Sequence, residues 1–428
     1  MPLNGARSRI RIYVWTALIF AFGIFVAVAC AAQTEFGGGQ SELTLREVGG
    51  QAPVGYVEIQ GVEAGEFNPH AWQNNQLSWV PDVREPFIPP RLGGTFRNIY
   101  APSAVELPQG WRLFYGGWDG VPSGNDRVYS VTTPDLVDFD QHELVIDHGV
   151  FIHVNNVNVE RLANGKYHMV CTVYPDRNDT NKPAYYESDN GTVWNGAAEP
   201  YAAEMKDILP IQGYSPFDQG DFNGANVLLW NGSKWLLYFN NWNDPGKLYW
   251  AEGISPRSVK LGGISLNTDH AVNDAKLFKT GGKDWYLMGL HKNTDTTWYS
   301  LSNDGMKFGE QKTLFSHLGE QDRYIVAVGF VVKGSRVLGV IYGAGAVPTL
   351  DRNRLFARWL QRKIVITDKD GVRHTAEGAL GPGRQWLKLP SSGVLSGVMQ
   401  VMGEDGVTPL GNTEVKLAAG KVYRLELK

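Results

Sequence analysis

Short apolar segments and turns alternate along the middle of the chain in a pattern that occurs five times. Each repeat has an apolar segment, a turn with Gly or Asn-Gly, and a second segment rich in aromatic or aliphatic residues. The paired segments are 103–107 with 111–115, 158–162 with 166–170, 226–230 with 234–238, 275–278 with 285–288, and 328–332 with 336–340. These pairs predict antiparallel hairpins, because turns such as Asn164-Gly165 and Asn231-Gly232 tolerate the positive φ of tight hairpins.

Four of the hairpins are followed by a third strand-like segment with a polar end, for example 185–194 and 299–305. No stretch of Val54–Ile366 has convincing helical periodicity with caps. A short meander cannot cover both of its faces by itself, but meanders stacked around a common axis cover one another. The five repeats therefore predict an all-β fold with a five-bladed β-propeller. A β-sandwich and a six-bladed propeller, with 54–98 as the extra blade, are the alternatives. Closure of the last blade is expected from Val54–Ile59 or Lys363–Thr367.

Residues 367–428 differ from the repeats. The aromatic hairpins stop there, but strand-like runs separated by glycines continue to the end. They predict a small C-terminal β accessory region, with a structural lid on the propeller as the alternative. The predicted propeller domain is therefore 51–366.

The amino-terminal segment is typical of an export signal. Arg7, Arg9 and Arg11 precede the apolar run Ile12–Ala29, and Cys30 follows a small-x-small pattern. We therefore expect a signal peptide within residues 1–32 and a flexible linker over 33–50. A lipoprotein with acylated Cys30, a free secreted or periplasmic protein, and an uncleaved anchor all fit this pattern.

The charged residues and the cysteine content limit the classes of binding partner and of cross-link that we expect. The 428 residues carry 40 Lys and Arg against 44 Asp and Glu, without a basic run, which argues against nucleic acid or an anionic membrane as partner. We expect membrane contact only through the amino terminus, and a monomer. Cys171 is the only other cysteine, so a disulfide framework is excluded, and Cys171 is expected to be a core residue. No His or Cys cluster has zinc spacing; no cofactor or metal is expected, although a structural cation in the shaft stays open.

The repeat resembles the five-bladed β-propeller glycoside hydrolases of the arabinanase and β-xylosidase type (family 43 and relatives). The likeness lies in Tyr100–Val105 with Leu113–Gly117, and in the Ser-x-Asp-x-Gly-like third strands, and covers about Arg97–Ile366. It implies an active site at the shaft mouth with three acids on inner strands: a base Asp, a pKa-tuning Asp and an acid Glu. Direct attack of water, commonly with inversion, is the implied reaction.

Only some of the acids implied by the resemblance have counterparts in this sequence. Ala101 and Asn156 stand where the resemblance implies acids in the first two repeats, whereas Asp274 stands at the fourth. Asp221 precedes the third repeat. We expect Asp274 and Asp221 to lie together at the mouth of one funnel as catalytic acids, with Glu320, or its neighbour Asp322, as the third.

Polar and aromatic residues near the same strand ends are candidates for sugar binding. Amides offer paired donors and acceptors for hydroxyl groups, and indole rings stack on pyranose faces. The alternatives are turn structure for the amides, a rim position for the histidines and blade packing for the rings. The candidates are Asn156, Asn158, Asn223, Asn226, His153, His270, Trp118, Trp242 and Trp298.

These observations predict an exported glycoside hydrolase with atypical acids that acts on a polysaccharide or oligosaccharide. A non-catalytic propeller that binds glycan at the cell surface is the alternative, favoured by Ala101 and Asn156.

Overall fold

The computed structural model describes residues 43–90, 97–119, 124–175, 181–197, 200–214, 225–241, 243–350 and 352–427. The predicted signal segment and Cys30 lie outside these residues. The described chain belongs to one compact unit, Gln40–Lys428, and is all-β. Its helical parts are the short helix α1 (Pro69–Gln73) and the 3₁₀ turn η1 (Met205–Asp207), and none of its helices is long and apolar enough to cross a membrane.

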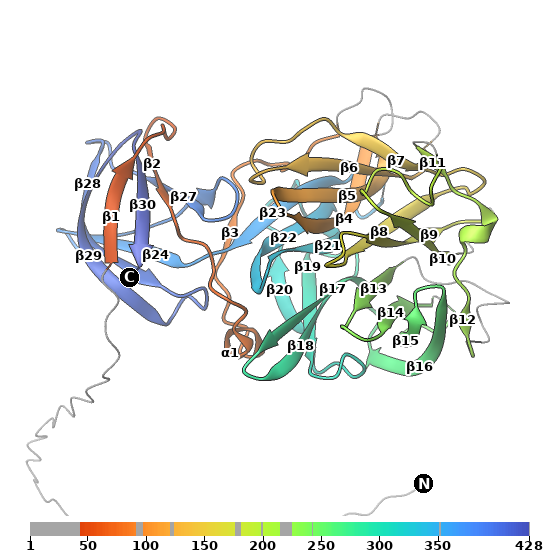
Figure 1. Ribbon diagram of the computed structural model, residues 1–428. Coiled ribbons are helices and arrows are strands. Elements are labelled where there is room, and N and C mark those ends of the chain that lie inside the picture. The colour runs from red at the N-terminus through yellow and green to blue at the C-terminus, as the bar shows by residue number, and fades with distance from the viewer. Residues whose placement is uncertain are drawn as a thin grey trace, which may run out of the picture. The chain divides into compact units, whose positions relative to one another are not determined.

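Five sheets, called sheets I to V, follow one another along the chain (Figure 1). In each, the two strands of the predicted hairpin and the strand that follows them are hydrogen-bonded neighbours. Sheet I is β4 (Arg97–Leu107), β5 (Gly110–Asp119), β6 (Arg127–Thr133), β7 (Glu143–Asp147) and β11 (Tyr201–Ala202), and sheet II is β8 (Val154–Arg161), β9 (Tyr167–Val173) and β10 (Lys182–Ser188). Sheet III is β13 (Asn226–Trp230), β14 (Trp235–Asn240), β15 (Lys247–Ser255), β16 (Ser258–Asn267) and β12 (Ile211–Gln212). Sheet IV is β17 (Ala271–Thr280), β18 (Lys283–His291), β19 (Thr296–Ser302) and β20 (Lys312–Ser316), and sheet V is β21 (Tyr324–Lys333), β22 (Arg336–Gly345), β23 (Arg354–Leu360) and β3 (Trp79–Pro81).

The first strands of the five sheets, β4, β8, β13, β17 and β21, form a ring. We call them the ring strands. Each contacts the ring strand of the next sheet, and β21 contacts β4. Each ring strand pairs in a β-ladder only within its own sheet. The ring strands of neighbouring sheets are joined by side-chain packing and by side-chain hydrogen bonds, such as the one from the Val159 backbone N–H to Ser103 Oγ.

Apolar side chains fill the spaces between successive sheets, which explains why the strands are buried on both faces. Phe278 of sheet IV packs in one cluster with Phe330 of sheet V, for example. All seven residues of β9 are buried, and Cys171 lies within the cluster between sheets I and II. Cys171 is completely buried, which confirms its prediction as a core residue, and this burial raises the pKa of its thiol.

Sheet V is completed by a strand from the amino-terminal part of the chain. Trp79 pairs with Leu360 and Pro81 with Arg358. The expected closing segments were wrong, because β2 (Tyr56–Gln60) and β24 (Lys363–Asp368) pair elsewhere. Among the described residues, 54–98 form no sheet of their own: β2 and β3 each join a sheet made with later strands.

Two further sheets combine both ends of the described chain. One contains β1 (Leu43–Val48), β30 (Val422–Leu427), β2, β27 (Arg384–Lys388) and β26 (Gly378–Ala379); the other contains β25 (Arg373–Thr375), β24, β28 (Val394–Met402) and β29 (Pro409–Ala418). Their inner faces share one core, in which Ile59 and Leu425 pack with Ile366 and Met399. The predicted C-terminal region therefore includes amino-terminal strands, and β1 lies inside the segment predicted as a linker.

Candidate functional site

Irregular pairing near the start of the ring strands brings residues from different sheets together. Register shifts against the second strand lie at 100–103 in β4, 155–158 in β8, 272–274 in β17 and 325–327 in β21. A bulge turns side chains away from the regular alternation. Residues at three of these bulges meet in a narrow cavity of about 10 Å³ that is lined by Ala101, Pro102, Asn156, Val157, Ala225, Asn226, Val272, Asn273 and Val328.

Ala101 and Asn156 occupy equivalent places in β4 and β8. Both have a φ of 50°, in the left-handed region that asparagine enters more readily than alanine. The place expected to carry a base in the first sheet thus has the geometry of the bulge but only a methyl group. No carboxylate comes from this position.

A larger cavity of about 240 Å³, which we call the starting-end cavity, lies at the same end of the ring. Its lining comes from the starts of ring strands and from neighbouring loops: Tyr100, Asn156, Tyr174, Ala225, Asp269, Ala271, His291, Lys292, Asn293, Val326 and Leu350. Among these described residues, Asp269 is the only carboxylate. Lys292 forms an ion pair with Asp269, and this hydrogen bond lowers the pKa of the Asp269 carboxyl.

The buried carboxylate of Asp126 holds the Tyr100 side chain in place at the wall of this cavity. Asp126 Oδ2 accepts hydrogen bonds from the Tyr100 hydroxyl (3.0 Å) and from Asn155 Nδ2 (2.8 Å). Burial, followed by the charge of Asp126, raises the pKa of Tyr100 well above its ordinary value, so the phenol stays protonated. His153 lies behind it, where its Nδ1 accepts from the Asp126 backbone N–H at 3.1 Å.

His291 is the imidazole that lines the cavity. Its Nδ1 lies 2.6 Å from Asn273 Oδ1, so Nδ1 is the donor, and the same Asn273 oxygen accepts from the Val328 backbone N–H. Burial, together with nearby His270, lowers the pKa of His291 to about 4. His291 is therefore a neutral hydrogen-bonding group or base at ordinary pH.

The lowered pKa of His291 predicts that the free energy of unfolding depends on pH. Its pKa is about 4 in the folded protein but near the ordinary 6.5 when unfolded, so the unfolded chain binds more protons between these values. Its contribution, about 3 kcal/mol, is present above pH 6.5 and is lost as the pH falls to 4. His291→Gln should flatten this part of the pH profile of the free energy of unfolding, measured in urea. His317→Gln, which removes a partly exposed imidazole, is the control; an equal effect of both variants would contradict the assignment.

Asp274 lies inside the ring and does not line the starting-end cavity. Its Oδ1 accepts from Asn158 Nδ2 (3.1 Å), from Lys276 Nζ (2.9 Å) and from the Ala275 backbone N–H. Its Oδ2 accepts from the Phe330 backbone N–H at 2.8 Å. The carboxylate thus connects β8, β17 and β21, a position that differs from the expected funnel mouth.

The remaining candidates with described side chains lie away from the lining of the starting-end cavity. Asn158 and Asn226 are buried and bonded within the ring, Asn158 also accepting from the Leu228 backbone N–H and Asn226 donating to Thr172 Oγ1. Away from the cavity lining, His270 stacks on Trp298 with ring centroids 3.9 Å apart, and its Nδ1 contacts Gln311.

Two acids in the segment that connects sheet IV to sheet V also lie outside the lining of the starting-end cavity. Glu320 is exposed and pairs with Arg323, whereas Asp322 is buried and accepts from the Tyr342 hydroxyl. Trp118 is not among the residues lining the cavity. Asp221, Asn223 and Trp242 lie outside the described residues.

Sequence reasoning missed Asp126, Asp269, His291 and Lys292. Asp126 directly precedes the third strand of sheet I, and His291 ends the second strand of sheet IV. The site residues were predicted from polar residues that stand before the first strand of each repeat. A search for polar residues at the ends of second strands and the starts of third strands would have found Asp126 and His291.

No family model and no curated protein matches the sequence. Solved structures that resemble the chain include glycoside hydrolases. A putative glycosidase from Bacteroides thetaiotaomicron is 12% identical, with a TM-score of 0.48 over 69% of this chain and 99% of that chain. An α-L-arabinofuranosidase from Podospora anserina is 13% identical, with a TM-score of 0.46 over 66% and 96%. A family 32 β-fructofuranosidase from Bombyx mori is 12% identical, with a TM-score of 0.46 over 83% and 93%. Likenesses of this size carry no argument about activity or substrate.

Proposed function

We propose that sheets I to V are the blades of a five-bladed β-propeller and that the two terminal sheets form a small β domain beside it. We further propose that the protein is an exported glycoside hydrolase that binds a neutral sugar in the starting-end cavity. The observation that carries this proposal is the composition of that cavity: hydroxyl, amide and neutral imidazole groups supplied at one end of the ring. Such groups match the alternating donors and acceptors of a sugar.

The chemistry requires an acid for the leaving oxygen and a base for water. Neutral His291 can accept a proton, and the Tyr100 oxygen, whose own proton is donated to Asp126, can accept a hydrogen bond from a sugar hydroxyl. Asp269 is ionised beside Lys292 and suits positioning of hydroxyl groups. The acid would come from Asp221, whose segment directly precedes β13.

The proposal is tested with a panel of neutral oligosaccharides and release of reducing ends as the measurement. We expect hydrolysis of at least one member, and loss of binding in Asn293→Leu, which replaces an amide of the cavity lining. Asn303→Leu, an exposed amide of a sheet IV turn, is the control. No hydrolysis and no binding by the wild type would contradict the proposal.

A second candidate function is glycan binding without catalysis. Ala101, which places a methyl group at the bulge where a base is expected, favours it. Calorimetric binding of an oligosaccharide that the protein leaves intact over long incubation would support this function in place of hydrolysis.

A further inference from the structure

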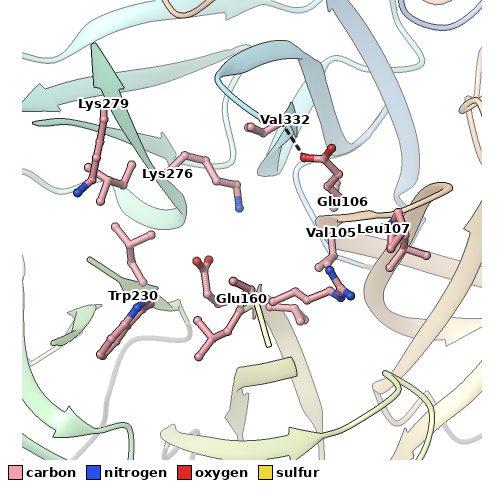
Figure 2. A pocket seen from close by; sticks show the side chains of 17 residues that line it. Val105, Glu106, Leu107, Glu160, Trp230, Lys276, Lys279 and Val332 are labelled. Atoms are coloured by element: carbon pink, nitrogen blue, oxygen red, sulfur yellow. Dashed lines mark hydrogen bonds between the residues drawn. The ribbon is translucent and has the colours of Figure 1, made fainter. Parts of the chain in front are cut away.

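The two ends of the ring differ in the side chains that they offer to a sugar. The end opposite the starting-end cavity has a cavity of about 630 Å³, and Figure 2 shows its charged side chains Glu106, Glu160, Lys276 and Lys279. The described residues that line it supply no hydroxyl, amide or imidazole side chain. Of these two cavities, the starting-end cavity is therefore the one that combines hydrogen-bonding groups for a sugar with a neutral base, His291.

A backbone group fixes which atom donates between His291 and Asn273. A backbone N–H can only donate, so the atom of the Asn273 amide that lies 3.3 Å from the Val328 nitrogen is the oxygen, Oδ1. This oxygen is an acceptor, and it lies 2.6 Å from His291 Nδ1. Nδ1 therefore carries the proton of the neutral ring, and Nε2 carries the lone pair.

The same contact decides which nitrogen of His291 faces a substrate. Asn273 lies at the register shift of β17 and lines the narrow cavity between the ring strands. It is not among the residues lining the starting-end cavity, whereas His291 is. The hydrogen bond thus turns Nδ1 toward the ring and leaves Nε2 for the starting-end cavity.

Burial makes this imidazole a weak base. It is the main reason that the pKa of His291 falls to about 4, and nearby His270 adds to it. Hydrogen bonding with the Ala271 backbone and with the Asn293 side chain opposes the fall. The ordinary pKa of an Asp or Glu carboxyl is about 3.9–4.3, so His291 has the basicity of the carboxylate that a glycoside hydrolase commonly uses.

The other groups near the imidazole add no net charge. Asp269 and Lys292, which line the same cavity, form an ion pair. Uncharged groups complete the cavity and the strands beside the imidazole: the phenols of Tyr100 and Tyr174, Thr297 of β19 and Val328 of β21. The amide of Asn273 keeps these surroundings uncharged, whereas a carboxylate in its place would favour the imidazolium.

We propose that Asn273 is a positioning residue for hydrolysis: it holds His291 as the Nδ1–H tautomer, so that Nε2 takes a proton from the attacking water in place of the carboxylate that Ala101 lacks. This inference rests on the proposed function. As the water oxygen bonds to the anomeric carbon, its proton passes to Nε2, while the general acid protonates the leaving oxygen. The imidazolium then loses its proton to solvent, which restores the base.

The first experiment is nitrogen-15 NMR of the histidine side chains in the sugar-free protein, with His291→Gln to identify the His291 signals. Above pH 5 we expect the wild type to show protonated Nδ1 and unprotonated Nε2, and to titrate near pH 4. Asn273→Leu removes the acceptor of the Nδ1 proton and should abolish the preference for this tautomer. Predominance of Nε2–H in the wild type, or an unchanged tautomer in folded Asn273→Leu, overturns the proposal.

Asn273→Asp is the variant that keeps the shape of the side chain and both hydrogen bonds. Its negative charge should raise the pKa of His291 from about 4 to about 5 or higher, because it stabilises the imidazolium. Asn303→Asp, at an exposed amide in a turn of sheet IV, is the matched control and should leave the titration in place. An unchanged titration of His291 in Asn273→Asp, shown to be folded by circular dichroism, overturns the proposal.

A confirmed substrate adds a kinetic readout. At pH 4 the wild type should keep about half of its plateau kcat/KM and Asn273→Asp about a tenth or less, because the base is protonated in the remainder. An acid limb that stays in place while the NMR titration moves overturns the role of Nε2. Absence of hydrolysis by a wild type with the expected tautomer refutes the proposed function and this role with it, whereas the wrong tautomer refutes the role of Asn273 alone.

Discussion

Replacement of Asp274 by alanine is expected to lower the free energy of unfolding by about 3–5 kcal/mol. The substitution leaves the Lys276 ammonium without its hydrogen-bonded carboxylate and removes the acceptor of Asn158 Nδ2 and the Phe330 N–H. Asp274 is only 1% exposed, so water cannot replace these bonds without opening the ring. Urea unfolding followed by tryptophan fluorescence measures the loss.

A double-mutant cycle identifies the cause. Asp274→Ala with Lys276→Met should cost less than the sum of the two single substitutions, because the second removes the uncompensated charge. Asp284→Ala removes a more exposed carboxylate 3.9 Å from Lys279 and should change stability by less than about 0.5 kcal/mol. If Asp274→Asn instead leaves stability unchanged and abolishes turnover of a confirmed substrate, Asp274 is catalytic and its structural assignment is wrong.

Replacement of Asp221 by asparagine is expected to reduce turnover of a confirmed substrate by roughly 10²–10⁴-fold, the range for loss of a general acid or base. The described lining of the starting-end cavity contains one carboxylate, Asp269, which is paired with Lys292. Besides the base, hydrolysis requires an acid, and the chain has Asp221 four residues before Ala225, which lines both the narrow cavity and the starting-end cavity.

Steady-state kinetics and substrate binding separate the outcomes. Binding to Asp221→Asn should survive, because the amide is similar in size, while kcat falls. Asp218→Asn changes a carboxylate of the same segment and is the matched control. Equal, small effects of both substitutions would remove Asp221 from the reaction.

The sequence was sufficient to predict the hairpins, because each pairs two apolar segments across a turn whose glycine or asparagine allows a positive φ. Gly165 and Gly232, for example, have φ of 89° and 99°. The closing strand Trp79–Pro81 could not be predicted in this way. Three residues are too few to show alternation, and their pairing partner lies on β23, far along the chain.

The positions of the candidate acids could be predicted less well than the hairpins. A shift of one residue in the register between paired strands changes which side chain faces a cavity. Asp274 was placed by its position at a strand start. The register shift between Val272 and Asp274 instead directs Asn273 to the cavity and Asp274 into the ring. Ala101 and Asn156 were located correctly at inner-strand starts, since their bulges follow the same pattern.

The pairing of β1 with β30 has a consequence for biosynthesis. Leu43 pairs with Leu427, a separation of 384 residues (427 − 43), and β2 also pairs with β30. A chain that emerges amino end first must therefore keep β1 and β3 unpaired until the strands that receive them have been made. A ribosome that stalls before β30 would leave β1 and the β30-facing edge of β2 unpaired, and such edges are a target for chaperones and proteases.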